Sequence, residues 1–389
     1  GIKVETTIVD GLQRCGNWVA RVAADKVSNA KTIQEVQVGI QETQSQLLGL
    51  GVFKKVDAWV DVAKGKDAAL NGVNVRFDVE EDVGFISIAS KADVGNNEGR
   101  AEAKVTLKNP LGIADQLTGT ATTSTADTTV FELVYRLPVS YDANYPLSYG
   151  AYQLKQDQEY SSHTQQHRGL FTKYQTYSFL GQHNLRYDAT WRNVAVKNNK
   201  ASFPIREQAG HSLKSSISHE LSVDMLDDNG EFGATLKLEN ELAGFGGDAH
   251  YLKNSMNYNH KVPLLAGCTI AGSFRAGVIN PFTYGAIPRT LIPREGTIFD
   301  SLLTRRGRPT TADNLEHRAT ELNKPSICDR FFLGGTSDVR GFQFRGIGPQ
   351  AKGDALGGDA FWAMGAHLYT PLPYKPWREY VGEERGCVR

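Results

Sequence analysis

Arg340 stands among glycines and aromatic residues late in the chain, within residues 331–349. The core of this run consists of Val339, Arg340, Gly341 and Phe342. Glycine allows unusual backbone angles and close approach, so such a loop can fold back and hold a cation in one place. A buried guanidinium needs a bidentate acceptor. Three acids are candidate partners for it: Asp359, Glu239 and Glu241.

Other chemistry finds little support in the sequence. Neither a phosphate-binding Gly-x-x-x-x-Gly-Lys-Ser/Thr pattern nor a Gly-x-Ser-x-Gly nucleophile turn occurs. His163 and His167 have a metal-ligand spacing, but they stand in the polar stretch 161–168, which predicts a solvated loop. The cysteines have no Cys-x-x-Cys spacing, and their pairing stays open. We expect no metal, no cofactor and no enzymatic activity.

Long stretches of the chain alternate between apolar and polar residues. For example, Phe131, Leu133 and Tyr135 alternate with polar or smaller neighbours. This period of two predicts strands with one apolar and one polar face. We predict twelve strands, near 84–92, 100–109, 116–124, 130–140, 147–157, 169–180, 182–197, 211–226, 231–244, 247–262, 265–279 and 357–372. A long loop, 281–356, separates the last two, and loops of that length are usually functional or disordered.

These strands favour a transmembrane β-barrel. A soluble sandwich would alternate in shorter strands, whereas segments of about ten residues suit tilted strands that cross a bilayer. Mean hydropathy is −0.38 and no long apolar helix is evident, which agrees with strands that face lipid on one side only. Lys plus Arg and Asp plus Glu balance at 43 each, so no bulk positive charge favours nucleic acid as a partner. The lipid-facing strands make the bilayer the expected partner.

Residues 1–83 form a different pattern, which predicts a small α+β domain. Expected elements are strand 2–9, helix 17–26, a helix from the capping box of Thr32 and Glu35 to Gly49, and strands 52–62 and 73–79. A free sheet edge in this domain could dock a partner by strand addition. The predicted division is therefore domain 1–83, barrel 84–376 and tail 377–389.

Several motifs together carry a family resemblance. The Leu-Gly-x-Phe-x-x-Val run at 50–56 resembles a POTRA domain. With the Val-Arg-Gly-Phe loop, Gly346–Pro349, Gly357–Trp362 and His367–Pro373, the chain resembles the BamA-like outer-membrane assembly factors. It is most similar to their mitochondrial branch, the barrel subunits of the sorting and assembly machinery.

The resemblance implies a barrel of about sixteen strands that inserts β-barrel precursors into the mitochondrial outer membrane. It implies a POTRA-like domain in the intermembrane space, other subunits of a sorting and assembly complex, and a seam between the first and last strands. Precursor strands would pair with the first strand at Phe85, Ile86, Ser87, Ile88, Ala89 and Ser90.

The sequence departs from the family after residue 376. The tail 377–389 is charged and shows no alternation, so four strands and the family's usual acidic partner of the loop arginine are absent. We therefore expect this chain to be a partial or alternatively spliced product that is not a competent insertase alone. Insertion of client proteins by the purified chain would contradict this expectation. The alternative function is a protein-translocating or passive outer-membrane channel.

Overall fold

The computed structural model describes residues 3–9, 22, 27, 30, 32–62, 72–82, 84–95, 98–197, 201–227, 232–264, 268–282, 325–335 and 338–370. The N-terminal elements are β1 (Lys3–Val9), α2 (Ile33–Gly49), β2 (Phe53–Val62) and β3 (Gly72–Glu81). Their sheet has the order β1-β3-β2, with β1 parallel and β2 antiparallel to β3. The strands predicted at 2–9, 52–62 and 73–79 are therefore present. The helix predicted at 17–26 lies outside the described residues.

Helix α2 covers one face of this small sheet. It begins at the predicted cap, where the Thr32 hydroxyl accepts a hydrogen bond of 3.2 Å from the backbone N–H of Glu35. Its apolar stripe, with Val36 and Leu47 fully buried, packs in one core with Val75 and Phe77 of β3. Burial of this stripe stabilises a helix that would be marginal alone.

A second, antiparallel sheet contains the twelve strands that follow. They are β4 (Ile86–Gly95), β5 (Glu98–Lys108), β6 (Gln116–Ser124), β7 (Thr129–Pro138), β8 (Pro146–Gln158), β9 (His163–Ser178), β10 (Gly181–Val196), β11 (Gly210–Leu226), β12 (Gly233–Ala243), β13 (Tyr251–Pro263), β14 (Thr269–Pro281) and β17 (Ala360–Tyr369). Each pairs with its neighbours in chain order, so all twelve predicted strands are confirmed.

The polar stretch 161–168 was wrongly predicted to be a solvated loop. From His163 onward it forms the first part of β9, paired in register with both β8 and β10. His163 is fully buried there. Both faces of this part of the strand are polar, so no apolar alternation marks it in the sequence. One face carries His163, Gln165 and His167, and the other carries Thr164, Gln166 and Arg168.

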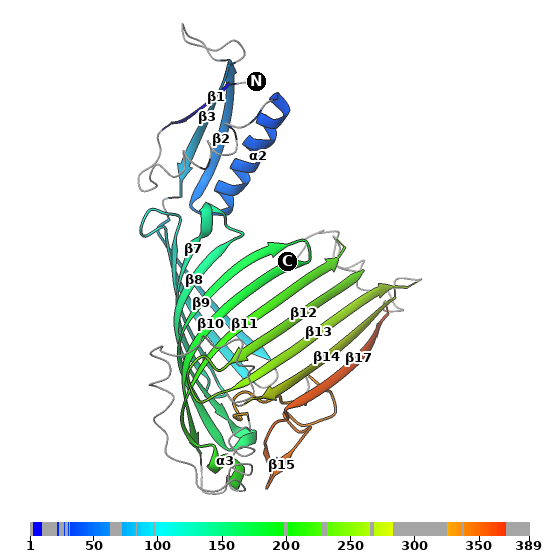
Figure 1. Ribbon diagram of the computed structural model, residues 1–389. Helices are drawn as coiled ribbons and strands as arrows, with labels where there is room; N and C mark the ends of the chain where they lie inside the picture. Colours follow the sequence, from blue (N-terminus) through cyan, green and yellow to red (C-terminus); the bar gives the residue numbers. More distant parts are fainter. Residues whose placement is uncertain are drawn as a thin grey trace, which may run out of the picture.

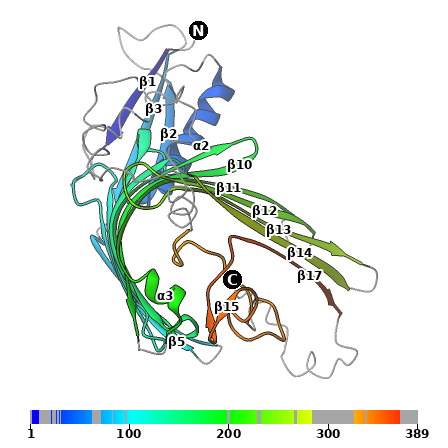
Figure 2. The same ribbon diagram turned by 60° about the horizontal axis from the view of Figure 1, so that its bottom comes forward.

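The large sheet curls into a wall with a concave inner face and a convex outer face (Figure 1). Figure 2 shows the described parts of the long loop, with β15 (Gln350–Ala351), on the concave side of the wall together with α3 (Phe203–Glu207). We call the face that contacts this loop the inner face. Strands β4 and β17 are the two ends of the sheet and do not pair with each other. Among the described residues, no helix has both the length and the apolar character needed to cross a membrane.

The small domain rests on the turns at one end of the wall. Ala114, in the β5–β6 turn, belongs to its hydrophobic core, and Tyr141 and Ala143 of the β7–β8 turn pack against that core. The Gln46 side chain donates a hydrogen bond of 2.9 Å to the Tyr141 carbonyl. Lys108, at the end of β5, pairs with Asp82 in the connection between the two sheets at 2.7 Å. We call this the module end of the wall.

Candidate functional site: an inner loop and two sheet edges

The long loop is attached to the wall through a buried acid, Asp329. This residue is only 4% exposed, and its carboxylate accepts a hydrogen bond of 2.7 Å from Arg192 on β10. The Tyr251 hydroxyl on β13 donates a second, of 2.8 Å, and Lys214 on β11 lies 3.6 Å away. Lys253 donates to the Asp329 backbone carbonyl at 2.8 Å. One loop residue thereby contacts three strands of the wall.

Electrostatics keep this carboxylate ionised. Burial alone would raise the pKa of Asp329, but the positive charges of Arg192 and Lys214 and the hydrogen bonds hold it below its ordinary value. A buried charge is tolerated only when it is paired and hydrogen-bonded, and here both conditions are met. The anchor is therefore an ion-pair cluster inside the wall.

Two residues further on, Phe331 packs over a glycine of the wall. A Cβ atom on Gly277 of β14 would lie 2.6 Å from ring atoms of both Phe331 and Phe361 of β17. The two rings are 4.6 Å apart at their centroids, and the Lys253 ammonium lies 4.5 Å from the Phe331 centroid. Gly277 thus provides the space in which the loop reaches the last described strand.

Two more loop acids make specific contacts. Asp338 pairs with Arg275 on the inner face of β14 and accepts a hydrogen bond of 2.8 Å from the Gly334 backbone N–H. Asp354 accepts a hydrogen bond of 2.6 Å from the Ser162 hydroxyl and one of 2.7 Å from the Ser202 backbone N–H. The loop is therefore attached at several points along the wall.

The predicted arginine motif lies on the exposed side of the loop. Arg340, Gly341 and Phe342 are exposed and Val339 is half-buried. Gly341 has a φ of +89°, which agrees with the expected need for glycine. Within the described residues, no carboxylate forms an ion pair with Arg340.

Each candidate partner of Arg340 is engaged elsewhere. Asp359 lies 3.6 Å from Arg330. Glu239 lies 2.7 Å from Lys237, and Glu241 lies 2.5 Å from Lys214. The structure does not bring these acids to Arg340, and an anchoring role for this arginine stays a prediction.

Sequence reasoning missed Asp329, although a signal was present. It is the only acid in the aromatic-rich segment 325–335, and inner-face cations stand on several predicted strands. A loop acid held by wall cations was as reasonable a prediction as a loop arginine held by a wall acid. Of the described residues, no group of three or more His, Cys, Asp and Glu side chains is arranged to hold a metal.

The first edge of the wall is β4, which pairs only with β5 among the described strands. The Phe85 carbonyl accepts a hydrogen bond of 2.8 Å from the Lys108 backbone N–H. Hydrogen-bonding pairs alternate along an antiparallel ladder. The N–H and C=O groups of the even-numbered residues therefore point away from β5: Ile86, Ile88, Ser90, Ala92 and Val94.

The other edge, β17, has the same arrangement. The Ile279 N–H donates to the Asp359 carbonyl at 2.7 Å, so the even-numbered residues of β17 direct their backbone groups away from β14. Trp362 and Met364 are among them, with exposed side chains. At both edges, the residues whose backbone groups point to the free edge are the same residues whose side chains lie on the outer face.

Comparisons with known proteins agree with this geometry. A model of the Omp85 superfamily domain matches residues 109–382. Sorting and assembly machinery component 50 homolog from Bos taurus is 32% identical over 387 residues, covering 98% of this chain and 74% of the relative. The Homo sapiens protein of that name is 31% identical with the same coverage. Among solved structures, BamA from Haemophilus ducreyi lacking POTRA domains 1–3 superposes with a TM-score of 0.72 at 16% identity, covering 96% of this chain and 68% of that chain.

Proposed function

The chain belongs to the Omp85 superfamily, and we propose its function from that membership. It is a β-barrel protein of the mitochondrial outer membrane that inserts and assembles β-barrel precursors there. We propose that precursors enter by pairing with the edge of β4, at Phe85, Ile86, Ser87, Ile88, Ala89 and Ser90. The observation that carries this step is that, among the described strands, β4 pairs with β5 alone.

The energetic reason for pairing at this edge is the bilayer itself. Each backbone group that points into hydrocarbon without a partner costs several kcal/mol. An incoming strand satisfies these groups on β4 and its own at the same time. Strand addition therefore proceeds downhill at this edge without an external source of energy.

The register of β4 also limits which strands can pair there. Ile86 and Ile88 face outward, whereas Lys91 and Asp93 lie on the inner face. Residues directly opposite in an antiparallel pair share a face. A suitable client strand is apolar opposite the isoleucines and polar opposite Lys91 and Asp93, which is the alternation of a barrel strand itself.

A proline substitution tests the pairing step. The Ile88 N–H points to the free edge, so Ile88→Pro removes one donor for a client strand while the β4–β5 ladder keeps its bonds. The matched variant Ala89→Pro removes a donor to β5 instead. We expect Ile88→Pro to fold and to lose cross-linking of a radiolabelled porin precursor to a photoreactive residue at Ser90.

A second photoreactive residue, at Leu170 on the outer face of β9, is the background control. Precursor bound equally well by the wild type and the Ile88→Pro variant would contradict pairing at β4. Cross-links confined to the inner face would favour the alternative function, a translocating channel, since a barrel wall alone also supports a pore.

We further propose that the N-terminal domain, residues 1–83, faces the intermembrane space and docks precursors or other subunits of the complex by strand addition. Strand β2 is an edge of its sheet, with Trp59 63% and Val60 56% exposed. Exposed aromatic residues on a strand edge suit partner contacts. The division into domain 1–83, barrel 84–376 and tail 377–389 remains part of this proposal.

A further inference from the structure

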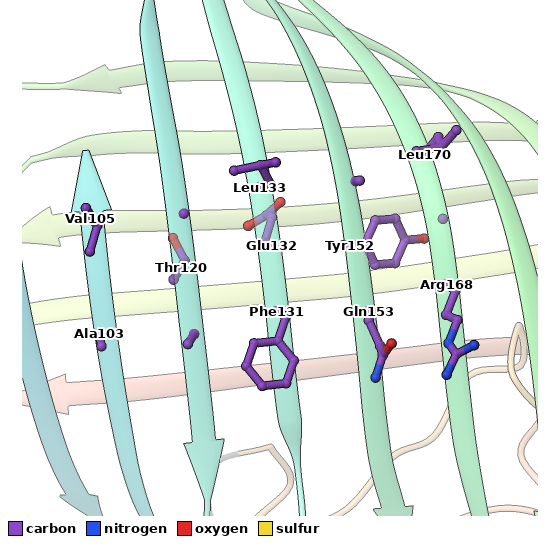
Figure 3. Close-up of a pocket in the computed structure, with 14 residues that line it drawn as sticks. Ala103, Val105, Thr120, Phe131, Glu132, Leu133, Tyr152, Gln153, Arg168 and Leu170 are labelled. Atoms are coloured by element: carbon purple, nitrogen blue, oxygen red, sulfur yellow. The ribbon is translucent and has the colours of Figure 1, made fainter. Parts of the chain in front are cut away.

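A shallow cavity of about 780 Å³ lies over strands β5 to β9. Most of its lining residues, including all the large apolar ones, belong to the outer-face row of these strands, so the cavity opens on the outer face. The inner-face row contributes Thr120, Glu132, Tyr152 and Gly169 to the lining. Small residues form its floor: Ala103, Gly119, Ala121 and Ala151. Larger apolar side chains border it, with Phe131, Leu133 and Leu170 all exposed. We call this depression the outer groove (Figure 3).

One end of the outer groove carries a cation and an amide. Arg168 of β9 and Gln153 of β8 are directly opposite each other, and Figure 3 shows them side by side in line with Phe131. The Arg168 guanidinium lies 5.6 Å from the ring centroid of Trp191 on β10. No carboxylate in the described part of the chain forms an ion pair with Arg168.

The surrounding residues place Arg168 at the border of the apolar band. The next outer-face row, away from the module end, is entirely polar and is formed by Lys155, Gln166, Asn193 and His211. The row on the other side contains Ala151, Leu170 and Ala189. Tryptophan beside such a border is typical of a membrane–water interface. Arg168 therefore stands where lipid headgroups meet the hydrocarbon.

We propose that the outer groove binds one anionic phospholipid, with its phosphate at Arg168 and Gln153 and an acyl chain over the small-residue floor. An arginine on a lipid-facing surface is costly without a counter-ion, and a headgroup phosphate supplies one with bidentate geometry. The apolar lining accepts a hydrocarbon chain and offers it no hydrogen bond. This inference rests on the membrane setting of the wall and is independent of precursor pairing at β4.

Native mass spectrometry of the full chain in a neutral detergent tests this site. The probes are dioleoylphosphatidic acid and dioleoylphosphatidylcholine, which share the same acyl chains. We expect the wild type to retain one phosphatidic acid in preference to phosphatidylcholine. Arg168→Gln should reduce that retention about fivefold, the effect of one cation on an anionic headgroup. Arg168→Lys should restore part of it.

Two further variants separate the headgroup from the groove. Lys155→Gln removes an outer-face cation on the polar row and should leave retention unchanged. Ala121→Phe fills the floor without altering charge and should weaken retention of phosphatidic acid. Heat-modifiable migration on gels shows whether each variant is folded. Lipid retention is then compared only among the folded variants.

Three results would overturn the proposal. Equal retention of both lipids, unaffected by Arg168→Gln, indicates annular lipid only. Displacement of phosphatidic acid by millimolar inorganic phosphate indicates a simple anion site. A protein subunit cross-linked to a photoreactive residue at Ala121 in mitochondrial membranes shows that the groove is a subunit interface. Precursor cross-linking at β4 is measured separately, so failure here leaves the proposed function untouched.

Discussion

At the scale of single residues, the structure shows a loop anchor, Asp329, whose charge is opposite to that of Arg340, the loop anchor that the sequence predicts. The motif around Arg340 predicts a loop cation held by a wall carboxylate. In the structure a loop carboxylate, Asp329, is held by wall cations, with Arg192 as its closest partner. Arg192 is itself almost fully buried, so neither charge could be left alone at low cost.

Replacement of Asp329 tests the importance of this anchor. We expect Asp329→Asn to destabilise the folded chain by about 3–5 kcal/mol, because Arg192 is left buried without a counter-charge. Asp354→Asn is the matched control, since Asp354 is also a buried loop acid but its hydrogen-bond partners are neutral. We expect Asp354→Asn to destabilise the folded chain by about 1–2 kcal/mol. Chemical denaturation in detergent measures both, and equal losses would contradict the ion-pair account.

The same carboxylate predicts a pH dependence. Its pKa lies below the ordinary Asp value of 3.8 in the folded chain, so its contribution to stability is fully present above that value. The contribution is lost only as the pH falls through the lower folded pKa. We expect the protection of segment 325–335 from hydrogen exchange, relative to the intrinsic rate at each pH, to stay high down to about pH 4 and to fall below it. Asp329→Asn should exchange rapidly at every pH; a protected segment in that variant would refute the prediction.

At the scale of elements, aromatic rings lie over glycines on the inner face and thereby fix the pairing of neighbouring strands. Phe171 of β9 covers Gly150 of β8, directly opposite it, and the Arg186 guanidinium lies 4.1 Å from the Phe171 centroid. Tyr152 covers Gly169 in the reverse direction and reaches Thr190 on β10 with a hydrogen bond of 2.8 Å. These contacts hold β8, β9 and β10 in one register.

A glycine-to-alanine pair tests this arrangement. A Cβ on Gly150 would lie 2.4 Å from the buried Phe171 ring, so Gly150→Ala should cost about 1–3 kcal/mol by overpacking. Gly119 on β6 is the matched control, because the nearest atom to its Cβ would be 4.0 Å away. We expect Gly119→Ala to be neutral or slightly stabilising. Thermal unfolding followed by heat-modifiable migration distinguishes the two, and an equal midpoint would contradict ring-over-glycine packing.

At the scale of the whole molecule, the small domain and the wall share a packed joint. The C-terminal end of α2 meets the β7–β8 turn, where a Cβ on Gly49 would lie 3.7 Å from the Ala143 side chain. The joint also contains Gln46 and the Lys108–Asp82 pair. The domain is thereby oriented at the module end of the wall, close to the start of β4 (Figure 1).

Disruption of the joint should loosen the domain without unfolding the wall. We expect Ala143→Arg to increase hydrogen exchange in α2 while the exchange of β8 to β11 stays unchanged, because Ala143 packs against the core of the small domain and a charged side chain there weakens that contact. Asn144→Arg is the control, since Asn144 is the exposed neighbour in the same turn. Identical exchange in both variants would show that the contact does not orient the domain.

The sequence by itself determined the twelve strands and the small α+β domain, because alternation and helix caps are local patterns. It also determined the family, through motifs around the late loop. Only the tertiary structure decided which charges meet. Asp329 and Arg192 are 137 residues apart, and their contact depends on the curvature that brings the loop against β10. The polar start of β9 and the outer groove likewise depend on strand register. Which residues are neighbours across a sheet cannot be inferred from the periodicity of the sequence.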